Sequence, residues 1–162
     1  MKAAEAKLIL LVENREADVL LVKSAFEKTG VDASVFVVRD GEAAIAYLQG
    51  EGKFSGRAEY PLPFLILLDL ETRRVDGIGV LEWIRQQPGS IRGLPVVVLT
   101  GSNRLADVNA AYQAGANSFL VKPHEFEDYI ALTRLIHRYW AEMAQVPEAF
   151  RPARGRQPGM DS

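Results

Sequence analysis

LILLDL, residues 65–70, is the stretch that decides the fold. Its aliphatic residues follow one another without any polar residue between them until Asp69. A strand with one solvated face would alternate, whereas an uninterrupted apolar run is typical of a strand buried on both faces, as in a parallel sheet covered by helices. Similar runs lie before and after it, at residues 8–12, 35–38, 95–99 and 118–121.

Segments with helical periodicity separate these apolar runs. The sequence predicts helices over residues 16–29, 41–49, 76–87, 102–114 and 125–145. Strand and helix therefore alternate along the chain, which predicts an α/β fold with a parallel sheet. Because crossovers between parallel strands are right-handed, we expect a flavodoxin-like doubly wound five-stranded parallel sheet with strand order 2-1-3-4-5. The last helix is expected to be an extended C-terminal helix that overshoots the sheet.

Composition sets the domain organisation and excludes several classes of protein. We expect one domain over residues 1–146 and a flexible tail, rich in Pro, Gly and Arg, over residues 147–162. Residues 50–63 are expected to form a long surface loop. The chain has no Cys, which excludes disulfides and thiolate metal sites, and no apolar run approaches the roughly 18 residues that a membrane span needs. The formal net charge of -2 gives no reason to expect binding to nucleic acid or membranes, so we expect a cytoplasmic protein.

Complementary polar residues follow the predicted strands, and the carboxyl ends of parallel strands meet at one edge of the sheet. Glu13 and Asn14 follow the first strand, and Asp69, Thr100 and Lys122 end the third, fourth and fifth. Each alone could be a helix cap, a turn residue or a solvated side chain. Together they favour phosphoryl transfer to Asp69, with Mg²⁺ on the acidic and amide oxygens. Lys122 would supply the compact positive charge and Thr100 the hydroxyl donor.

The motifs around these residues resemble the response-regulator receiver domain of two-component signalling. The resemblance covers residues 8–143. The chain is similar above all to small receivers that partner phytochrome-type histidine kinases. The segments that carry it are ILLVENREAD (9–18), LILLDL (65–70), VDGIGVLEWIR (75–85), PVVVLTGS (95–102) and AGANSFLVKP (114–123).

The resemblance implies a role for individual residues. Asp69 would accept the phosphoryl group from a histidine kinase, and Glu71 would offer its backbone carbonyl to Mg²⁺ beside the side chains of Glu13 and Asn14. Thr100 and Phe119 would form the switch that reports phosphorylation, and the peptide bond to Pro123 would be cis. Such a protein signals by contact and is not an enzyme that turns over metabolites.

Two positions depart from the pattern of the family. Asn14 stands where the family keeps a second carboxylate, and the loss of one charge predicts Mg²⁺ binding weakened by about 1–3 kcal/mol. Arg73 stands where the family usually has Pro. The alternative is therefore a degenerate receiver that works without phosphorylation. A flavodoxin-like cofactor binder would need a Ser, Thr or Gly phosphate loop after the first strand, where this chain has residues 13–18.

The last predicted helix carries apolar residues around more than half of its circumference. Packing against a single sheet buries a narrower stripe than this. Tyr139, Trp140 and Met143, near its end, are therefore expected to form the interface of a homodimer. The alternative is that the helix end folds back on its own domain. The tail arginines, Arg151, Arg154 and Arg156, favour a solvated tail over nucleic-acid binding.

Overall fold

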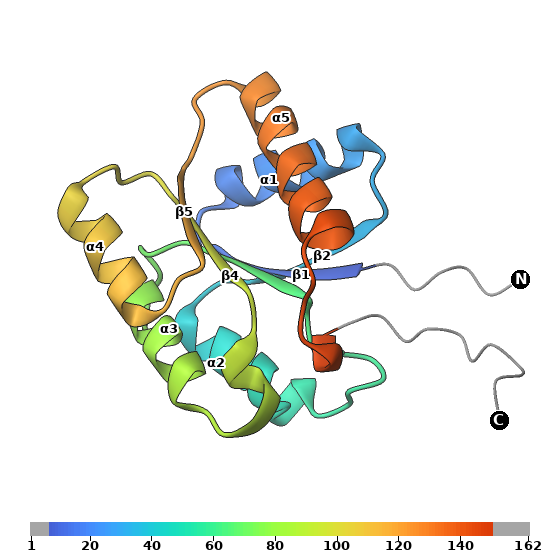
Figure 1. Cartoon of the computed structure of the whole chain (residues 1–162), viewed down its shortest axis with the longest axis vertical. Coiled ribbons are helices and arrows are strands. Elements are labelled where there is room, and N and C mark those ends of the chain that lie inside the picture. Colours follow the sequence, from blue (N-terminus) through green and yellow to red (C-terminus); the bar gives the residue numbers. More distant parts are fainter. Residues whose placement is uncertain (1–6, 151–162) are drawn as a thin grey trace, which may run out of the picture.

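The chain forms a single parallel sheet between two layers of helices (Figure 1), in a computed structural model that describes residues 7–150. The strand order is β2-β1-β3-β4-β5, and every neighbouring pair is parallel. The flavodoxin-like architecture and the order 2-1-3-4-5 are therefore confirmed. The strands are β1 (Lys7–Val12), β2 (Ala33–Val38), β3 (Leu65–Leu68), β4 (Val96–Thr100) and β5 (Ser118–Val121).

The helices divide between the two faces of the sheet. The pair α1 and α5 packs together on one face, and α2, α3 and α4 lie side by side on the other (Figure 1). Because both faces are covered, the residues of β3 and β4 are buried throughout, which explains their unbroken apolar sequence. The helices are α1 (Glu16–Thr29), α2 (Gly41–Gln49), α3 (Gly77–Gln86), α4 (Leu105–Ala114) and α5 (Phe126–His137).

Local signals set the helix boundaries near the carboxyl edge of the sheet. Asp40 and Asp76 cap α2 and α3, each accepting a hydrogen bond of 2.7 Å from a backbone amide three residues on. The first residue of α3, Gly77, packs directly on the end of β3, where an added Cβ would lie 2.6 Å from the carbonyl oxygen of Asp69. Only glycine allows so close an approach, so this residue fixes how α3 leaves the strand that ends at Asp69.

The segment 50–63 is held more tightly than a surface loop. It contains a short 3-10 helix, Gly52–Phe54, and the ring of Phe54 is buried. Phe54 and Tyr60 pack on Phe36 and Tyr47, with ring centroids 5.1–6.1 Å apart. We call these four residues the aromatic cluster; it closes the amino edge of the sheet, before β3 begins.

The C-terminal helix extends as expected, with two differences. After α5 the chain continues as a π-helix over Arg138–Met143, whose wider turns end the helix two residues before the predicted limit. A further 3-10 helix, Glu148–Phe150, follows, and the side chain of Phe150 is buried in the core. Residues 148–150, which fall in the range predicted as a flexible tail, are thus attached to the domain by the burial of an aromatic ring. The remaining tail, with Arg151, Arg154 and Arg156, lies outside the described residues.

No helix between residues 7 and 150 combines the length and the apolar character needed to cross a bilayer.

Candidate functional site

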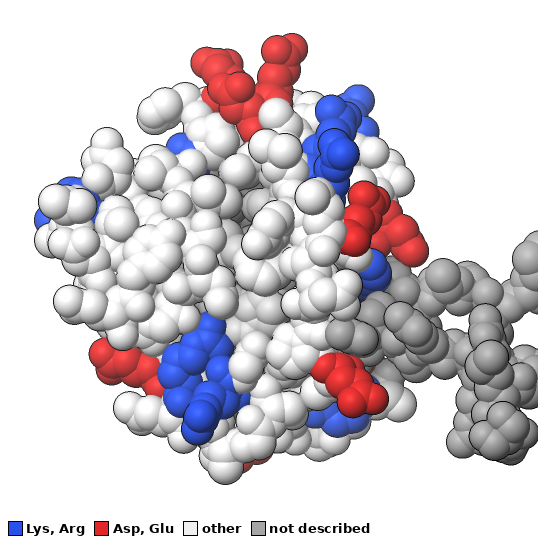
Figure 2. All heavy atoms as spheres, viewed as in Figure 1, with Lys and Arg blue, Asp and Glu red and all other residues white. Residues whose placement is uncertain are grey.

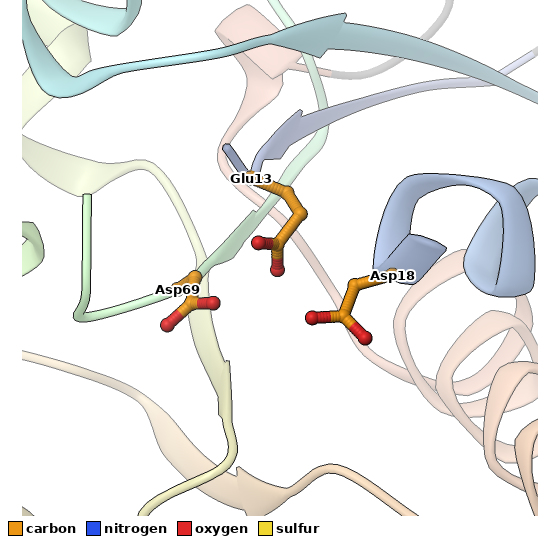
Figure 3. A group of neighbouring side chains, drawn as sticks. All are labelled: Glu13, Asp18 and Asp69. Atoms are coloured by element: carbon orange, nitrogen blue, oxygen red, sulfur yellow. The ribbon is translucent and has the colours of Figure 1, made fainter. Parts of the chain in front are cut away.

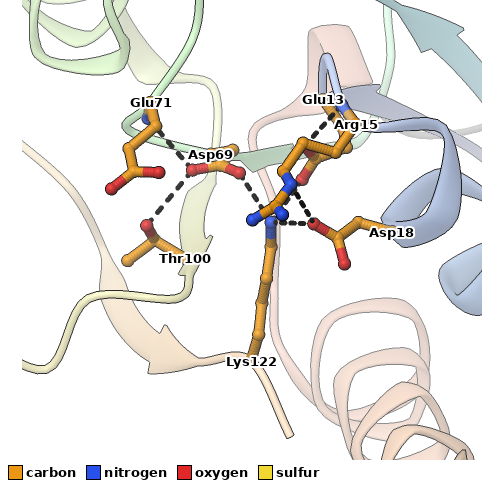
Figure 4. A network of polar contacts seen from close by, with 7 residues as sticks. All are labelled: Glu13, Arg15, Asp18, Asp69, Glu71, Thr100 and Lys122. Carbon is orange, nitrogen blue, oxygen red and sulfur yellow. Dashed lines mark hydrogen bonds and ion pairs between the residues drawn. The ribbon is translucent and has the colours of Figure 1, made fainter. Parts of the chain in front are cut away.

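Four of the predicted site residues meet at the carboxyl edge of the sheet (Figure 4). The ammonium of Lys122, after β5, lies 2.6 Å from Oδ2 of Asp69 and 2.7 Å from Oε2 of Glu13. The hydroxyl of Thr100, at the end of β4, donates to Oδ1 of Asp69 over 3.1 Å. The edge of the sheet thus collects two carboxylates, one hydroxyl and one ammonium, as the strand-end pattern predicts.

Backbone hydrogen bonds carry the regularity of the sheet into the site. The amide of Asp69 donates to the carbonyl of Val12 over 3.0 Å, and the amide of Lys122 donates to the carbonyl of Thr100 over 2.8 Å. Beyond β3 the chain turns so that the amide of Glu71 donates to Oδ1 of Asp69 over 3.0 Å. The carboxylate of Asp69 is therefore oriented by a hydroxyl and an amide on one oxygen and by an ammonium on the other.

Burial makes the charges in this cluster act strongly on one another. Glu13 and Asp69 are only 2% and 3% exposed. Burial, and then the neighbouring carboxylate of Asp69, raise the pKa of Glu13 to about 7, against the influence of Lys122. Burial acts in the same direction on Asp69, but its contacts with Glu13, Lys122 and the Glu71 amide outweigh it and lower its pKa. Asp69 is therefore the ionised carboxylate near neutral pH, while Glu13 carries a proton part of the time.

A third carboxylate, from Asp18, joins the cluster, and the residues at the strand ends do not predict it. Its Oδ2 lies 2.8 Å from the ammonium of Lys122, and the carboxylates of Glu13, Asp18 and Asp69 bring one oxygen each within 4.8 Å of one another (Figure 3). Burial opposes the charge of Lys122, but Asp18, Asp69 and Glu13 outweigh it and raise its pKa. Asp18 lies in the first turn of α1, five residues after Glu13, so only the direction of that helix brings it to the site.

The residues present fit a divalent cation. The cluster offers oxygen ligands alone, which Mg²⁺ and Mn²⁺ accept. The side-chain oxygen of Asn14 is buried and has no hydrogen-bond partner among the described residues. A buried polar atom without a partner is costly, and a cation or an ordered water would satisfy it.

The peptide bond that precedes Pro123 is trans, because no cis peptide bond occurs between residues 7 and 150. The expectation of a cis bond is wrong for this structure; an X-Pro bond favours trans by about 0.5–1 kcal/mol unless its surroundings select the other form. Phe119, the second predicted switch residue, is half-buried in β5 and packs against the core, while Thr100 is fully buried.

The loop after Asp69 carries the second departure from the family pattern. Arg73 is exposed, and its carbonyl accepts a hydrogen bond of 3.3 Å from the amide of Gly41. Arg74 has a left-handed backbone (φ 68°), which is rare for a residue with a side chain. Its guanidinium lies 3.8 Å from Asp40 and 3.4 Å from Glu42. These arginines therefore join the loop to α2 and do not enter the cluster around Asp69.

The predicted interface residues lie away from this site, on the π-helix that extends α5. Tyr139 and Met143 are exposed, as is Leu135 one turn before Tyr139. Trp140 is half-buried, packs on the core and meets the ring of Tyr139 edge to face, with the centroids 5.0 Å apart. Trp140 therefore folds back on its own domain, while its neighbours face outward. Figure 2 shows a broad uncharged area on the face that presents α4 and β5, with the charged residues at its rim.

Comparison with known proteins identifies the family over most of the chain. The model of the response regulator receiver domain matches residues 9–134. Response regulator Rcp1 from Synechocystis sp. is 38% identical over 143 residues, which cover 88% of this chain and 95% of Rcp1.

Solved structures of similar proteins share the fold. The phosphorylated cyanobacterial phytochrome response regulator RcpA is 34% identical with a TM-score of 0.79, covering 88% of this chain and 99% of RcpA. Response regulator RPA3017, from red light signalling of R. palustris, is 32% identical with a TM-score of 0.82, covering 86% of this chain and 97% of RPA3017. The Mn²⁺-bound form of Rcp1 has a TM-score of 0.77 and is 38% identical over 87% of this chain and 99% of Rcp1. With the matched sequence, the shared fold and the cluster at the edge of the sheet, this chain belongs to the response regulator receiver domain family.

Proposed function

We propose that this receiver accepts a phosphoryl group from a histidine kinase on Asp69 and passes the signal on by protein contacts that depend on phosphorylation. One observation carries the proposal: the buried carboxylate of Asp69 is held between the Thr100 hydroxyl and the Lys122 ammonium, beside further carboxylates that suit a divalent cation. Stabilisation of a transferring phosphoryl group needs positive charge and hydrogen-bond donors placed in advance.

In the transfer step, an oxygen of ionised Asp69 attacks the phosphorus of the kinase phosphohistidine. The new P–O bond forms as the P–N bond breaks, and the imidazole leaves with the bonding electrons and takes up a proton. The lowered pKa of Asp69 keeps its carboxylate ready to attack near neutral pH. Lys122 and Thr100 then donate to the phosphoryl oxygens, and the Glu71 amide keeps the carboxylate oriented. A Mg²⁺ ion bound at the site would supply positive charge against the phosphoryl oxygens.

The Mg²⁺ ligands in this proposal are the side chains of Asp69, Glu13 and Asn14 and the backbone carbonyl of Glu71. The oxygen-only cluster and the unpaired buried oxygen of Asn14 support this assignment. Because the Asn14 amide carries no charge, Mg²⁺ binds more weakly here than it would beside a carboxylate. The Mn²⁺-bound structure of Rcp1 supports a divalent cation in this family.

The phosphoryl group acts through Thr100 and Phe119. Thr100 moves toward the phosphoryl oxygens and gives up its hydrogen bond to Asp69, and the half-buried ring of Phe119 takes the space it leaves. The two residues lie on neighbouring strands, β4 and β5, so a small shift of one side chain reaches the other. The surface near β5 then differs between the two states.

A phytochrome-type histidine kinase is the partner that the relatives support. RcpA is a phytochrome response regulator, and RPA3017 takes part in red light signalling. Phosphotransfer profiling tests this assignment: a phytochrome-type kinase from the source organism should label this chain faster than its other kinases do. Preferential labelling by a kinase without a phytochrome module would contradict it.

We further propose that the receiver is a homodimer through the outward face of the last helix, with Tyr139 and Met143 and with Trp140 supporting them from behind. Leu135 and Met143 are 65% and 64% exposed, which is unusual for such side chains and is typical of an interface. Light scattering at micromolar concentration should give twice the chain mass, and Met143→Glu should give a monomer. A monomeric mass for the unchanged protein would contradict the homodimer.

Phosphoryl acceptance is tested with acetyl phosphate and Mg²⁺, read by intact mass and peptide mapping. The unchanged chain should gain one phosphoryl group on the peptide that contains Asp69, and Asp69→Asn should gain none. No adduct on the unchanged chain at saturating Mg²⁺ would instead support a degenerate receiver. The presence of Asp69, Thr100 and Lys122 together counts against that alternative.

A further inference from the structure

Asp18 is the one carboxylate of the Lys122 cluster that comes from a helix. Its Oδ2 lies 2.8 Å from the Lys122 ammonium. The carboxylate oxygens of Glu13 and Asp69 lie at similar distances from that ammonium, 2.7 and 2.6 Å. The ammonium therefore donates hydrogen bonds to Asp18 and Asp69 and forms an ion pair with Glu13 (Figure 4). Asp18 takes no part in the proposed phosphoryl transfer or in the proposed set of Mg²⁺ ligands.

Two of these three partners change when the site is used. The proposed transfer turns Asp69 into an acyl phosphate, and the proposed cation draws Glu13 and Asp69 toward itself. Lys122 then loses both of the carboxylates that end strands, although its ammonium must stay within reach of the phosphoryl group. Its side chain is nearly buried, so an unpaired charge there would be costly while the cation is bound and the phosphoryl group has not yet arrived.

We propose that Asp18 is a positioning residue, which keeps the Lys122 ammonium in the site while Glu13 and Asp69 bind the cation. This inference rests on the proposed function and adds a regulating contact to the same site. The carboxylate of Asp18 is well placed for the task, because it belongs to α1 and not to a loop after a strand: the first helical hydrogen bond of α1 joins the amide of Val19 to the carbonyl of Arg15 over 3.0 Å.

Competition for Asp18 from other cations is weak. The guanidinium of Arg15 lies 3.8 Å from the same oxygen, but its side chain is 70% exposed, against 17% for Asp18. An exposed pair at that distance contributes about 0–1 kcal/mol. Lys122, which is far less exposed, is therefore the partner that Asp18 holds.

The first experiment observes the ammonium itself, by NMR of the ¹⁵N-labelled lysine side chain. A hydrogen-bonded ammonium exchanges its protons slowly and gives a visible signal, and Lys122→Met identifies which signal is that of Lys122. Without Mg²⁺, the signal should be present in both the unchanged chain and Asp18→Asn, because Glu13 and Asp69 still hold the ammonium. At saturating Mg²⁺, confirmed from the backbone amide shifts of Glu13 and Asp69, the signal should persist in the unchanged chain and disappear in Asp18→Asn.

Glu16→Gln is the matched control for this change. Glu16 lies in the same first turn of α1 and pairs with Arg39, away from the site, so the control removes the same charge from the same helix end. It should behave as the unchanged chain does. A Lys122 signal that persists in Asp18→Asn with Mg²⁺, or that is lost from the unchanged chain with Mg²⁺, would overturn the inference.

The second experiment measures the rate of phosphorylation by acetyl phosphate. Asp18→Asn should slow the reaction by about 10- to 100-fold, because the ammonium is no longer held in place. Asp18→Glu should restore most of the rate, which a purely structural role of Asp18 would not predict. If the unchanged chain gains no phosphoryl group, the proposed function fails, but the NMR experiment still decides whether Asp18 holds Lys122. A rate for Asp18→Asn equal to that of the unchanged chain would overturn the inference alone.

Discussion

The two edges of the sheet are built on opposite principles. At the amino edge, polar groups beside the aromatic cluster pair with backbone carbonyls: the Tyr47 hydroxyl donates to the carbonyl of Pro61 over 2.8 Å, and Arg57 donates to the carbonyls of Tyr47, Leu48 and Tyr60. At the carboxyl edge, three carboxylates share the single ammonium of Lys122. The first edge is satisfied as it stands, whereas the second carries more negative charge than its own residues neutralise.

This difference separates stability from function. Packed aromatic rings with paired polar groups stabilise the folded chain and need nothing further. A buried surplus of carboxylates contributes little to stability, because each added charge repels the others. It is, however, ready to bind a cation, and through it a phosphoryl group. We therefore expect substitutions at the two edges to affect different measurements.

The largest effect on stability is expected from Tyr47→Ala. Tyr47 is fully buried at the centre of the aromatic cluster, and removal of so large a ring costs about 3–5 kcal/mol of unfolding free energy. Asp69→Asn should change the unfolding free energy by less than about 1 kcal/mol, because Lys122 keeps Glu13 and Asp18 as partners. Urea denaturation of both variants measures the two values. A loss at Asp69 as large as the loss at Tyr47 would contradict the separation of roles.

Asn14→Asp should bring the charge at the carboxyl edge to the level usual in the family. The added carboxylate should tighten Mg²⁺ binding by about 5- to 150-fold, which corresponds to about 1–3 kcal/mol. Calorimetric titration with Mg²⁺ measures the affinity, and Asn14→Ala is the control that removes the oxygen ligand altogether. An affinity that does not change on Asn14→Asp would show that residue 14 lies outside the cation site.

Glu13 should make stability depend on pH. Its pKa is about 7 in the folded chain, against the ordinary value of 4.5 that applies to the unfolded chain. The folded state therefore holds the proton more tightly than the unfolded state does. The resulting stabilisation is complete below about pH 4.5 and is lost as the pH rises to about 7, by on the order of 1–3 kcal/mol. The lowered pKa of Asp69 acts in the opposite direction, and its contribution is lost only as the pH falls below the ordinary carboxyl range.

Glu13→Gln isolates this contribution, because the amide does not titrate. Urea denaturation in the presence of a chelator, at pH 5 and pH 7.5, should show that the unchanged chain loses stability between the two values and that Glu13→Gln loses much less. Equal losses in the two proteins would mean that Glu13 is not the titrating group.

Tyr47→Phe should have a much smaller effect on stability than Tyr47→Ala. It keeps the ring contacts of the aromatic cluster and removes one hydrogen bond, to the carbonyl of Pro61, at a cost of about 0.5–1.5 kcal/mol. Burial raises the pKa of Tyr47 to about 12, so its hydroxyl stays protonated and donates throughout the neutral range. Urea denaturation is again the measurement, and a cost close to that of Tyr47→Ala would show that the hydroxyl, and not the ring, holds this edge.

The sequence predicts what depends on periodicity and on strand ends. The unbroken apolar residues of 65–68 predict a central strand, and the rule that strand ends share one edge predicts the meeting of Glu13, Asp69 and Lys122. Asp18 escapes this reasoning, because its place depends on the angle at which α1 leaves β1. The pattern of apolar residues in the strands does not predict that angle.

Composition misleads where single side chains decide. Pro and Gly in residues 50–63 predict a surface loop, and the composition of residues 147–162 predicts a flexible tail. Burial of Phe54 and of Phe150 nevertheless attaches parts of both segments to the domain. The trans bond before Pro123 and the π-helix after α5 depend on small energy differences that their surroundings decide. Such differences are set by packing and leave no periodic signal.

A crystal structure of the chain with Mg²⁺ and beryllofluoride tests whether the carboxyl edge is a phosphoryl site. It should show a trifluoride group bonded to an Asp69 oxygen, with the Lys122 ammonium and the Thr100 hydroxyl within hydrogen-bond distance of its fluorines. The cation should lie between that group and Glu13. Crystals grown at saturating Mg²⁺ and beryllofluoride in which Asp69 stays bare and paired with Lys122, 2.6 Å apart as here, would contradict the proposed function.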